Sequence, residues 1–140
     1  MNPSSPVPLL CCGIFARELR SIDRGLRDRI DPVFLDSMLH MRPALLEKRL
    51  GEAIEGVATR GALMVYGDCC PHMSELCSAA DKPRTRGINC IEIALGSLRY
   101  RELRRDGAFF FMPEWLQRWQ EVFVVELGFA EMELARTFMN

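Results

Sequence analysis

The segment ALMVYGDCC, residues 62–70, decides how the rest of the chain is interpreted. Residues 62–66 are apolar, Gly67 interrupts the run, and two adjacent cysteines, Cys69 and Cys70, follow. A short apolar run bounded by turn residues is typical of a buried strand. A second such run, residues 9–12, also ends in a cysteine pair and a glycine. The two segments therefore predict two buried strands, each with thiols at or just beyond its carboxyl end.

The regions around these two runs alternate between helical and extended patterns. Pro43 suits the first turn of a helix, and the apolar stripe behind it predicts a helix over residues 43–59. Asn89 is a suitable N-cap for a helix to about residue 103. Further helices are expected at 14–26, from 113 onward and at 129–139, and further strands at 33–39 and 108–112. This order favours an α/β fold, a two-layer or three-layer sandwich with a small, largely parallel sheet of about four strands.

The length of the chain, 140 residues, is enough for one domain with its own core. We assign residues 1–140 to a single α/β domain. Residues 1–7 are polar and proline-containing, so we expect a loose N-terminus. Residues 67–89 are rich in turn formers, which predicts a long loop where functional groups are often found.

Composition and charge exclude several classes of function. The chain is 49% hydrophobic and 26% charged, its net charge is −1 and its pI is near 6.1, which argues against nucleic acid or an anionic membrane as partner. No apolar stretch approaches the ~20 residues of a membrane span, and the N-terminus does not resemble a signal peptide. We therefore expect a cytoplasmic protein. Phosphate-binding loops, HExxH and GxSxG are absent from the sequence.

The six cysteines form the strongest functional signal. In a reducing compartment, metal binding or thiol chemistry is more common than disulfides. The carboxyl ends of parallel strands meet at one edge of a sheet, so Cys12 and Cys69 should lie near each other, with Cys90 at the start of a helix beside them. Three thiolates can hold zinc and leave a fourth position open, and they can also hold an iron–sulfur cluster. We also expect the helix N-terminus to lower the pKa of Cys90.

Four further residues are candidates for the same site. His40 follows an extended segment and precedes a helix, and it can supply a metal ligand or a general acid. His72, close behind the second cysteine pair, is another candidate metal ligand. Arg42 can bind a carboxylate or phosphate, and Glu92 can contact a substrate, although either residue can instead serve its own helix.

The motifs CGIFARELR (12–20), LHMRPALLEKRL (39–50), LMVYGDC (63–69) and NCIEIALGSLRYRELRRDGAFFFMPEW (89–115) resemble the uncharacterised DUF1638 family. The resemblance selects Cys12, Cys69 and Cys90 as the single cysteines of the family's motifs. It also implies an association with corrinoid-dependent methyl transfer, with a corrinoid protein or a methyltransferase as partner. Two differences stand out. This chain is a shortened member, and it has Cys70-Pro71-His72-Met73 where the family has a glycine-rich loop.

These observations lead to three hypotheses of different kinds. The first is a protein that binds zinc or an iron–sulfur cluster through Cys12, Cys69 and Cys90, with zinc favoured because an open position on zinc suits the activation of a substrate thiol. The second is a non-catalytic accessory protein with structural cysteines. The third is a thiol redox protein. Whether the chain is an enzyme is left open by the sequence.

Overall fold

The computed structural model describes residues 5–57, 61–79, 83–126, 128 and 137. Three strands form the sheet: β1 (Val7–Cys12), β2 (Ile30–Leu35) and β3 (Leu63–Val65). Their order is β2-β1-β3, and β1 pairs with both neighbours in parallel. The carboxyl ends of all three strands therefore point to the same edge of the sheet. The predicted α/β fold with a small parallel sheet is confirmed.

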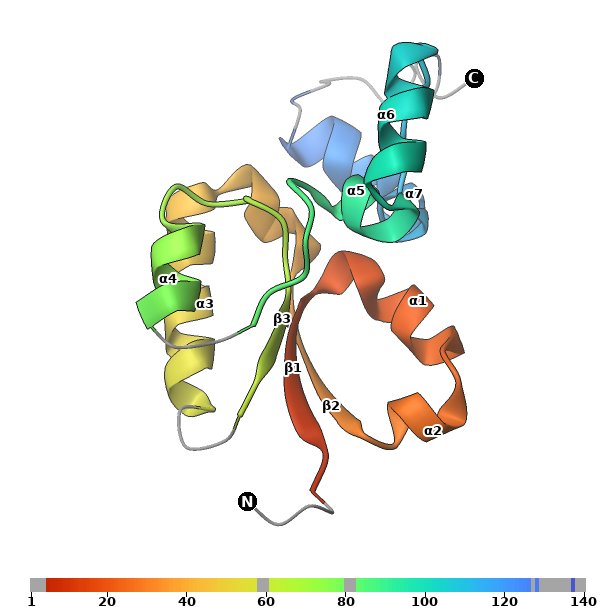
Figure 1. Ribbon diagram of the computed structural model, residues 1–140. Helices are drawn as coiled ribbons and strands as arrows, with labels where there is room; N and C mark the ends of the chain where they lie inside the picture. Colours follow the sequence, from red (N-terminus) through yellow and green to blue (C-terminus); the bar gives the residue numbers. More distant parts are fainter. Residues whose placement is uncertain (1–4, 58–60, 80–82, 127, 129–136, 138–140) are drawn as a thin grey trace.

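Helices cover both faces of this sheet, which makes the fold three-layered (Figure 1). On one face lie α3 (Pro43–Gly56) and α4 (Met73–Ala79), and on the other lie α1 (Ala16–Ser21) and α2 (Arg24–Arg27). The central strand β1 packs into both layers, because successive side chains of a strand point to opposite faces. Leu10 joins the core beneath α3 and α4, whereas Leu9 and Cys11 join the opposite core.

The predicted helix at residues 43–59 is observed as α3, and the local sequence explains it. Pro43 occupies the first turn, where its missing N–H leaves no hydrogen bond unmade. Leu46, Leu50 and Ile54 recur at helical spacing and are buried against the sheet. Burying a leucine or isoleucine side chain is worth about 1.5–3 kcal/mol, so this stripe fixes α3 on its face. Residues 58–59 of the predicted helix lie outside the described residues.

A third group of helices lies over the carboxyl edge of the strands (Figure 1). It consists of α5 (Cys90–Leu95), α6 (Ser97–Arg105), α7 (Pro113–Gln117) and the π-helical η3 (Glu121–Glu126). The continuous helix predicted from Asn89 to about residue 103 is wrong at one point. Gly96 has a φ of 77°, which breaks the helix into α5 and α6. Asn89 caps α5 as predicted, because its side chain accepts a hydrogen bond from the N–H of Glu92.

Several other element boundaries differ from the sequence-based prediction. The helix expected at 14–26 is divided into the 3-10 helix η1 (Gly13–Phe15), α1 and α2. The strand expected at 33–39 begins earlier and ends at Leu35, where the 3-10 helix η2 (Ser37–Met41) follows. The loop predicted at 67–89 contains α4, and Val7 is in a strand rather than in a loose terminus. The predicted tail helix, 129–139, lies almost wholly outside the described residues.

The fourth strand predicted at residues 108–112 does not form. This apolar run passes over the end of the sheet, where Met112 packs against Ile14 and Phe15 instead of a strand edge. Only the end of the run is buried, since Met112 is 6% exposed and Phe109 is 74% exposed. Across the part of the chain that is described, no helix is both long and apolar enough to span a bilayer.

Candidate functional site

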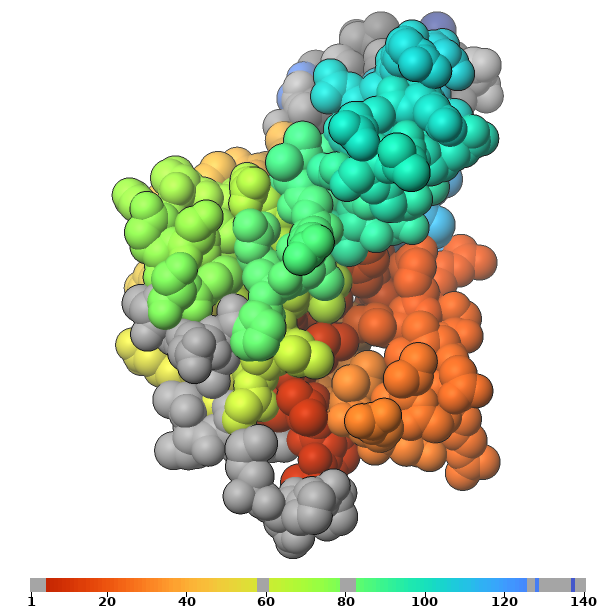
Figure 2. Space-filling view, viewed as in Figure 1, coloured from red at the N-terminus to blue at the C-terminus, as the bar shows by residue number. Residues whose placement is uncertain are grey.

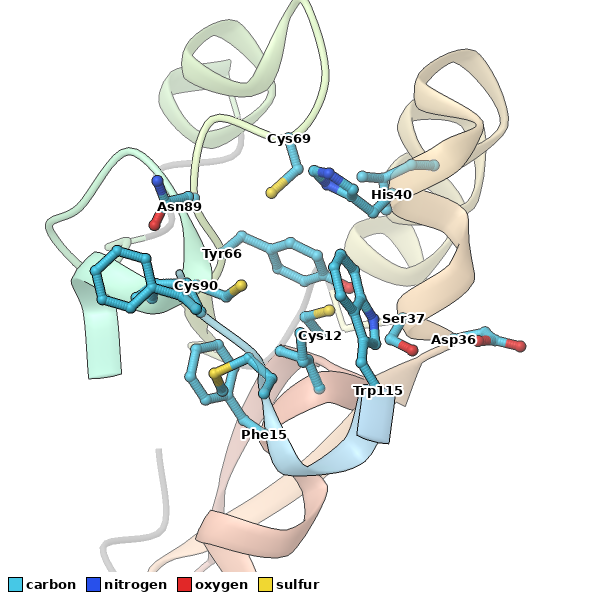
Figure 3. Close-up of a pocket in the computed structure, with 16 residues that line it drawn as sticks. Cys12, Phe15, Asp36, Ser37, His40, Tyr66, Cys69, Asn89, Cys90 and Trp115 are labelled. Carbon is cyan, nitrogen blue, oxygen red and sulfur yellow. The ribbon is translucent and has the colours of Figure 1, made fainter. Parts of the chain in front are cut away.

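A pocket of about 190 Å³ opens at the carboxyl edge of the sheet, beneath α5 and α7 (Figure 3). Cys12, Cys69 and Cys90 all line it. His40, from η2, lines it as well. Four of the residues that the sequence analysis names as candidates, from distant parts of the chain, therefore line one cavity. The other walls are mostly apolar or aromatic, and they include Ile14, Phe15, Leu46, Tyr66, Phe110, Met112 and Trp115.

Gly67 explains how Cys69 and Cys90 come to share this pocket. A Cβ atom on Gly67 would lie 2.6 Å from the Cα of Asn89 and 2.7 Å from the carbonyl oxygen of Ile88. Only glycine permits so close an approach of two backbones. The N–H of Asp68 also donates a 2.9 Å hydrogen bond to the Ile88 carbonyl. The segment before α5 is thereby held against the end of β3, with Cys90 one residue further on.

Arg84 strengthens the same junction from the other side. Its guanidinium donates to the backbone carbonyl of Tyr66 at 3.0 Å and to the carboxylate of Asp68 at 2.7 Å. Asn89 adds a further link, because its side-chain amide donates to the Tyr100 hydroxyl at 2.8 Å and so connects α5 to α6. The turn that carries Cys69 is therefore fixed by polar contacts on both sides.

The opposite wall is positioned by Arg118. Its guanidinium contacts the carboxylates of Asp36 at 2.6 Å, Glu114 at 3.1 Å and Glu121 at 2.6 Å. The Ser37 hydroxyl donates to Glu114 at 2.7 Å, which joins η2 to α7. These contacts dock α7 beside η2 and place Trp115 on the pocket, where its ring lies 5.8 Å from the ring of His40.

The three pocket thiols are protonated at neutral pH, because burial disfavours their charged form. Burial raises the pKa of Cys12 to about 12 and that of Cys90 to about 11, and it also raises the pKa of Cys69. The expectation of a lowered pKa at Cys90 is therefore wrong. Backbone hydrogen bonds at the start of α5 do favour the thiolate, but their effect is smaller than that of burial. A negative charge on Cys69, when that thiol ionises, would raise the pKa of Cys12 and of Cys90 further.

The remaining candidate residues lie away from the pocket. His72 is exposed on the outer face, where its Nδ1 lies 2.9 Å from the Glu47 carboxylate. Arg42 is exposed just before α3 and does not line the cavity. Glu92 accepts a hydrogen bond from the N–H of Ile88, so its carboxylate serves the start of its own helix.

The three remaining cysteines are buried in the two cores. Cys11 packs on one face of the sheet, and Cys70 and Cys77 pack on the other. The thiol of Cys77 lies 3.6 Å from the sulfur of Met64. All six cysteines are free thiols. Each doublet therefore places one cysteine on the pocket and buries the other.

The pocket thiols are not arranged around a single position that one ion could occupy. Within the described ranges, no three histidine, cysteine, aspartate or glutamate side chains are positioned to hold a metal ion together. A tetrahedral zinc site needs sulfur atoms roughly 3.5–4 Å apart, since each Zn–S bond is near 2.3 Å. A single zinc ion would therefore require the thiols to move inward.

Two pocket residues were not predicted from the sequence as functional. The hydroxyl oxygen of Tyr66 and the indole nitrogen of Trp115 are buried and have no hydrogen-bond partner among the described residues. The sequence patterns suggested only a strand end for Tyr66 and core packing for Trp115. One weak signal existed at Tyr66, which directly precedes the strand-ending glycine.

The fold and the pocket define a small parallel α/β protein with a thiol-lined cavity at the carboxyl edge of its sheet. The model of a family described as "Protein of unknown function (DUF1638)" matches residues 34–140. The protein therefore belongs to the DUF1638 family. The matched residues include Cys69, Cys90 and His40, and Cys12 precedes them. No curated protein and no solved structure matches the chain significantly.

Proposed function

We propose that this protein binds a metal centre in the pocket through Cys12, Cys69 and Cys90, with His40 as a fourth candidate ligand. The observation that supports the proposal is the convergence of three thiols and one imidazole on a single cavity. Thiolate and imidazole are the ligands that zinc and iron–sulfur clusters prefer. A cytoplasmic location is part of the proposal, because free thiols persist in a reducing compartment.

Within this proposal we place an iron–sulfur cluster ahead of a single zinc ion. A cluster is bound through several iron atoms, each with its own cysteine, so its ligands need not converge on one point. Zinc would require the three sulfurs to close to roughly 3.5–4 Å, and their present arrangement does not hold one ion. With either centre, three cysteine ligands leave one position open. Such a centre, when bound, would supply Lewis-acid chemistry that lowers the pKa of a substrate thiol, so that the thiol gives its proton to solvent more readily.

Metal analysis of anaerobically purified protein tests this proposal. Wild-type protein should carry zinc or iron, and an iron–sulfur cluster should add a visible absorbance band. Cys69→Ala should lose the metal, whereas Cys77→Ala, which removes a thiol outside the pocket, should keep it. His40→Gln and His72→Gln form a second matched pair, in which only the change at His40 should weaken binding. Less than about half an equivalent of metal after reconstitution, or no loss in Cys69→Ala, would contradict the proposal.

We propose as a second candidate an accessory role beside a corrinoid protein or a methyltransferase. It is supported by two large apolar side chains that are each 74% exposed: Leu98, in α6, and Phe109, in the segment between α6 and α7. Figure 2 shows the α5–α6 segment projecting beyond the strand layers. Apolar side chains so exposed are a common feature of protein interfaces. Stoichiometric capture of such a partner, retained when all three pocket cysteines are replaced and lost in Leu98→Asp, would favour this role.

A thiol redox function has less support. Redox-active cysteines have a low pKa that favours the thiolate, whereas burial raises the pKa of every pocket thiol here. A disulfide between two of the pocket cysteines under mild oxidation would restore this hypothesis.

A further inference from the structure

The pocket is larger than a metal ion requires. Its volume is about 190 Å³. An engineered apolar cavity of about 150 Å³ in another protein binds benzene, so the present cavity has room for an organic molecule of about six to eight non-hydrogen atoms. Phe15, Phe110 and Met112 supply apolar walls that suit a hydrocarbon body.

Two buried polar atoms on this cavity lack partners. The Tyr66 side chain is 1% exposed, and its hydroxyl has no hydrogen-bond partner in the described parts of the chain. The same is true of the Trp115 indole N–H. Figure 3 shows the Tyr66 ring crossing the pocket, with its hydroxyl toward the side where Trp115 and Ser37 lie. A buried polar group without a partner is costly, and natural structures rarely retain one without a reason.

Two other polar side chains on the pocket, those of Ser37 and Asn89, already have partners. Ser37 donates to Glu114 and accepts a hydrogen bond from Arg118. The Asn89 carbonyl oxygen accepts the α5 cap hydrogen bond, and its amide donates to Tyr100. Tyr66 and Trp115 therefore differ from Ser37 and Asn89, because their buried donor atoms have no hydrogen-bond partner among the described residues. Both have an N–H or O–H to donate, and burial together with the nearby thiols raises the pKa of Tyr66 and keeps its hydroxyl protonated.

The charge around the pocket identifies the kind of acceptor that fits. No lysine or arginine is among the described residues that line the cavity. Arg118, at the wall formed by α7, is shared by three carboxylates, and Arg84, at the turn that carries Cys69, is paired with Asp68, so neither guanidinium is left to balance an anion. Burying an anion here would be unfavourable without a balancing cation. An uncharged oxygen acceptor, such as a ketone or an amide carbonyl, avoids that cost.

We infer that the pocket binds a small uncharged organic molecule with an apolar body, whose oxygen accepts hydrogen bonds from the Tyr66 hydroxyl and the Trp115 indole N–H. Binding of this molecule is a separate property from metal binding and does not depend on it, because neither Tyr66 nor Trp115 is a proposed metal ligand.

A matched pair of probes tests the inference on the full chain, with and without removal of metal. Cyclohexanone and methylenecyclohexane have the same size and shape, but only the ketone accepts hydrogen bonds. Binding is followed through the two indole N–H resonances in ¹⁵N-labelled protein. Trp119 does not line the pocket and serves as the internal control, with Trp119→Phe used to assign the two signals.

The ketone should shift the Trp115 N–H resonance downfield and leave that of Trp119 in place. In Tyr66→Phe, the ratio of ketone to alkene affinity should fall by about fivefold, the worth of one neutral hydrogen bond. An unchanged ratio, an unmoved Trp115 signal, or no binding of either probe at millimolar concentration would each overturn the inference. If Tyr66→Phe fails to fold, the wild-type Trp115 signal decides. Metal content is measured on the same samples, so failure of metal binding is seen separately.

Discussion

Replacing Gly67 with alanine should destabilise the protein by pushing apart the two segments that carry Cys69 and Cys90. The added methyl group would lie 2.6 Å from the Asn89 Cα, whereas ordinary contacts begin near 3.4 Å, so one backbone must move by about 0.8 Å. The nearest atoms all belong to the backbone of residues 88 and 89, so no side chain can rotate away. Overpacking of this kind typically costs about 1–3 kcal/mol.

Gly51→Ala provides the matched control, because it adds the same methyl group to a helix interior. An added Cβ on Gly51 meets nothing within 4 Å, and alanine favours α3 by about 0.5–1 kcal/mol relative to glycine. Urea unfolding of both variants gives the free energy of unfolding and its slope m. With m of about 1–3 kcal/mol per molar, a loss of about 2 kcal/mol lowers the midpoint by roughly 1 M.

The reasoning fails if Gly67→Ala unfolds within about 0.5 kcal/mol of wild type, which is the range of neutral surface substitutions. It also fails if Gly67→Ala loses stability while the environment of the pocket is unchanged. The Trp115 indole N–H signal reports on that environment. A shift of this signal in Gly67→Ala, with none in Gly51→Ala, is the expected result.

Four further perturbations have defined outcomes. In the folded protein the pKa of Cys12 is about 12 and that of Cys90 is about 11, both above the ordinary value of 9.0. The two protonated thiols should therefore contribute their full stabilisation to metal-free protein below pH 9.0 and lose it as pH rises toward the folded pKa values. Urea unfolding at a series of alkaline pH values measures this loss. Metal binding should in turn release protons, measurable in weakly buffered solution, and should weaken as pH falls. Asn89→Ala should cost about 1 kcal/mol through loss of the helix N-cap, and an unchanged urea midpoint would contradict that role. The hydrogen bond from Arg118 lowers the pKa of Asp36 below its ordinary value of 3.8, so this pair should stabilise the protein fully above that pH and lose its effect as pH falls through the lowered value. The difference in unfolding free energy between Arg118→Gln and wild type should therefore be largest near neutral pH and should shrink as pH falls below 3.8.

Local sequence patterns predicted the sheet and α3 because those elements depend on short-range periodicity. The apolar run at 108–112 misled the prediction, since hydrophobicity alone does not reveal whether a strand edge is within reach. Gly96 likewise divides a helix whose apolar spacing continues across it. In both cases the deciding factor is a tertiary or backbone constraint that composition does not encode.

The pocket was predictable to the extent that topology determines it. Parallel strands bring their carboxyl ends together, which placed Cys12 and Cys69 on one cavity. The pKa of Cys90 was not predictable, because the helix start and burial act in opposite directions and only coordinates reveal which effect is larger. The unpartnered donors of Tyr66 and Trp115 could not be recognised at all, because missing partners are a property of the folded arrangement.

The walls of the pocket come from segments spread between residues 12 and 115, so the ribosome adds them to the chain at different times. All three strands are translated before Phe110 and Trp115. A growing chain can therefore assemble its sheet while these two walls of the cavity are still missing. Capture of any ligand is thereby deferred until the segment that carries Phe110 and Trp115 has been added. A chain stalled before that point would expose its pocket thiols to solvent without the burial that keeps them protonated.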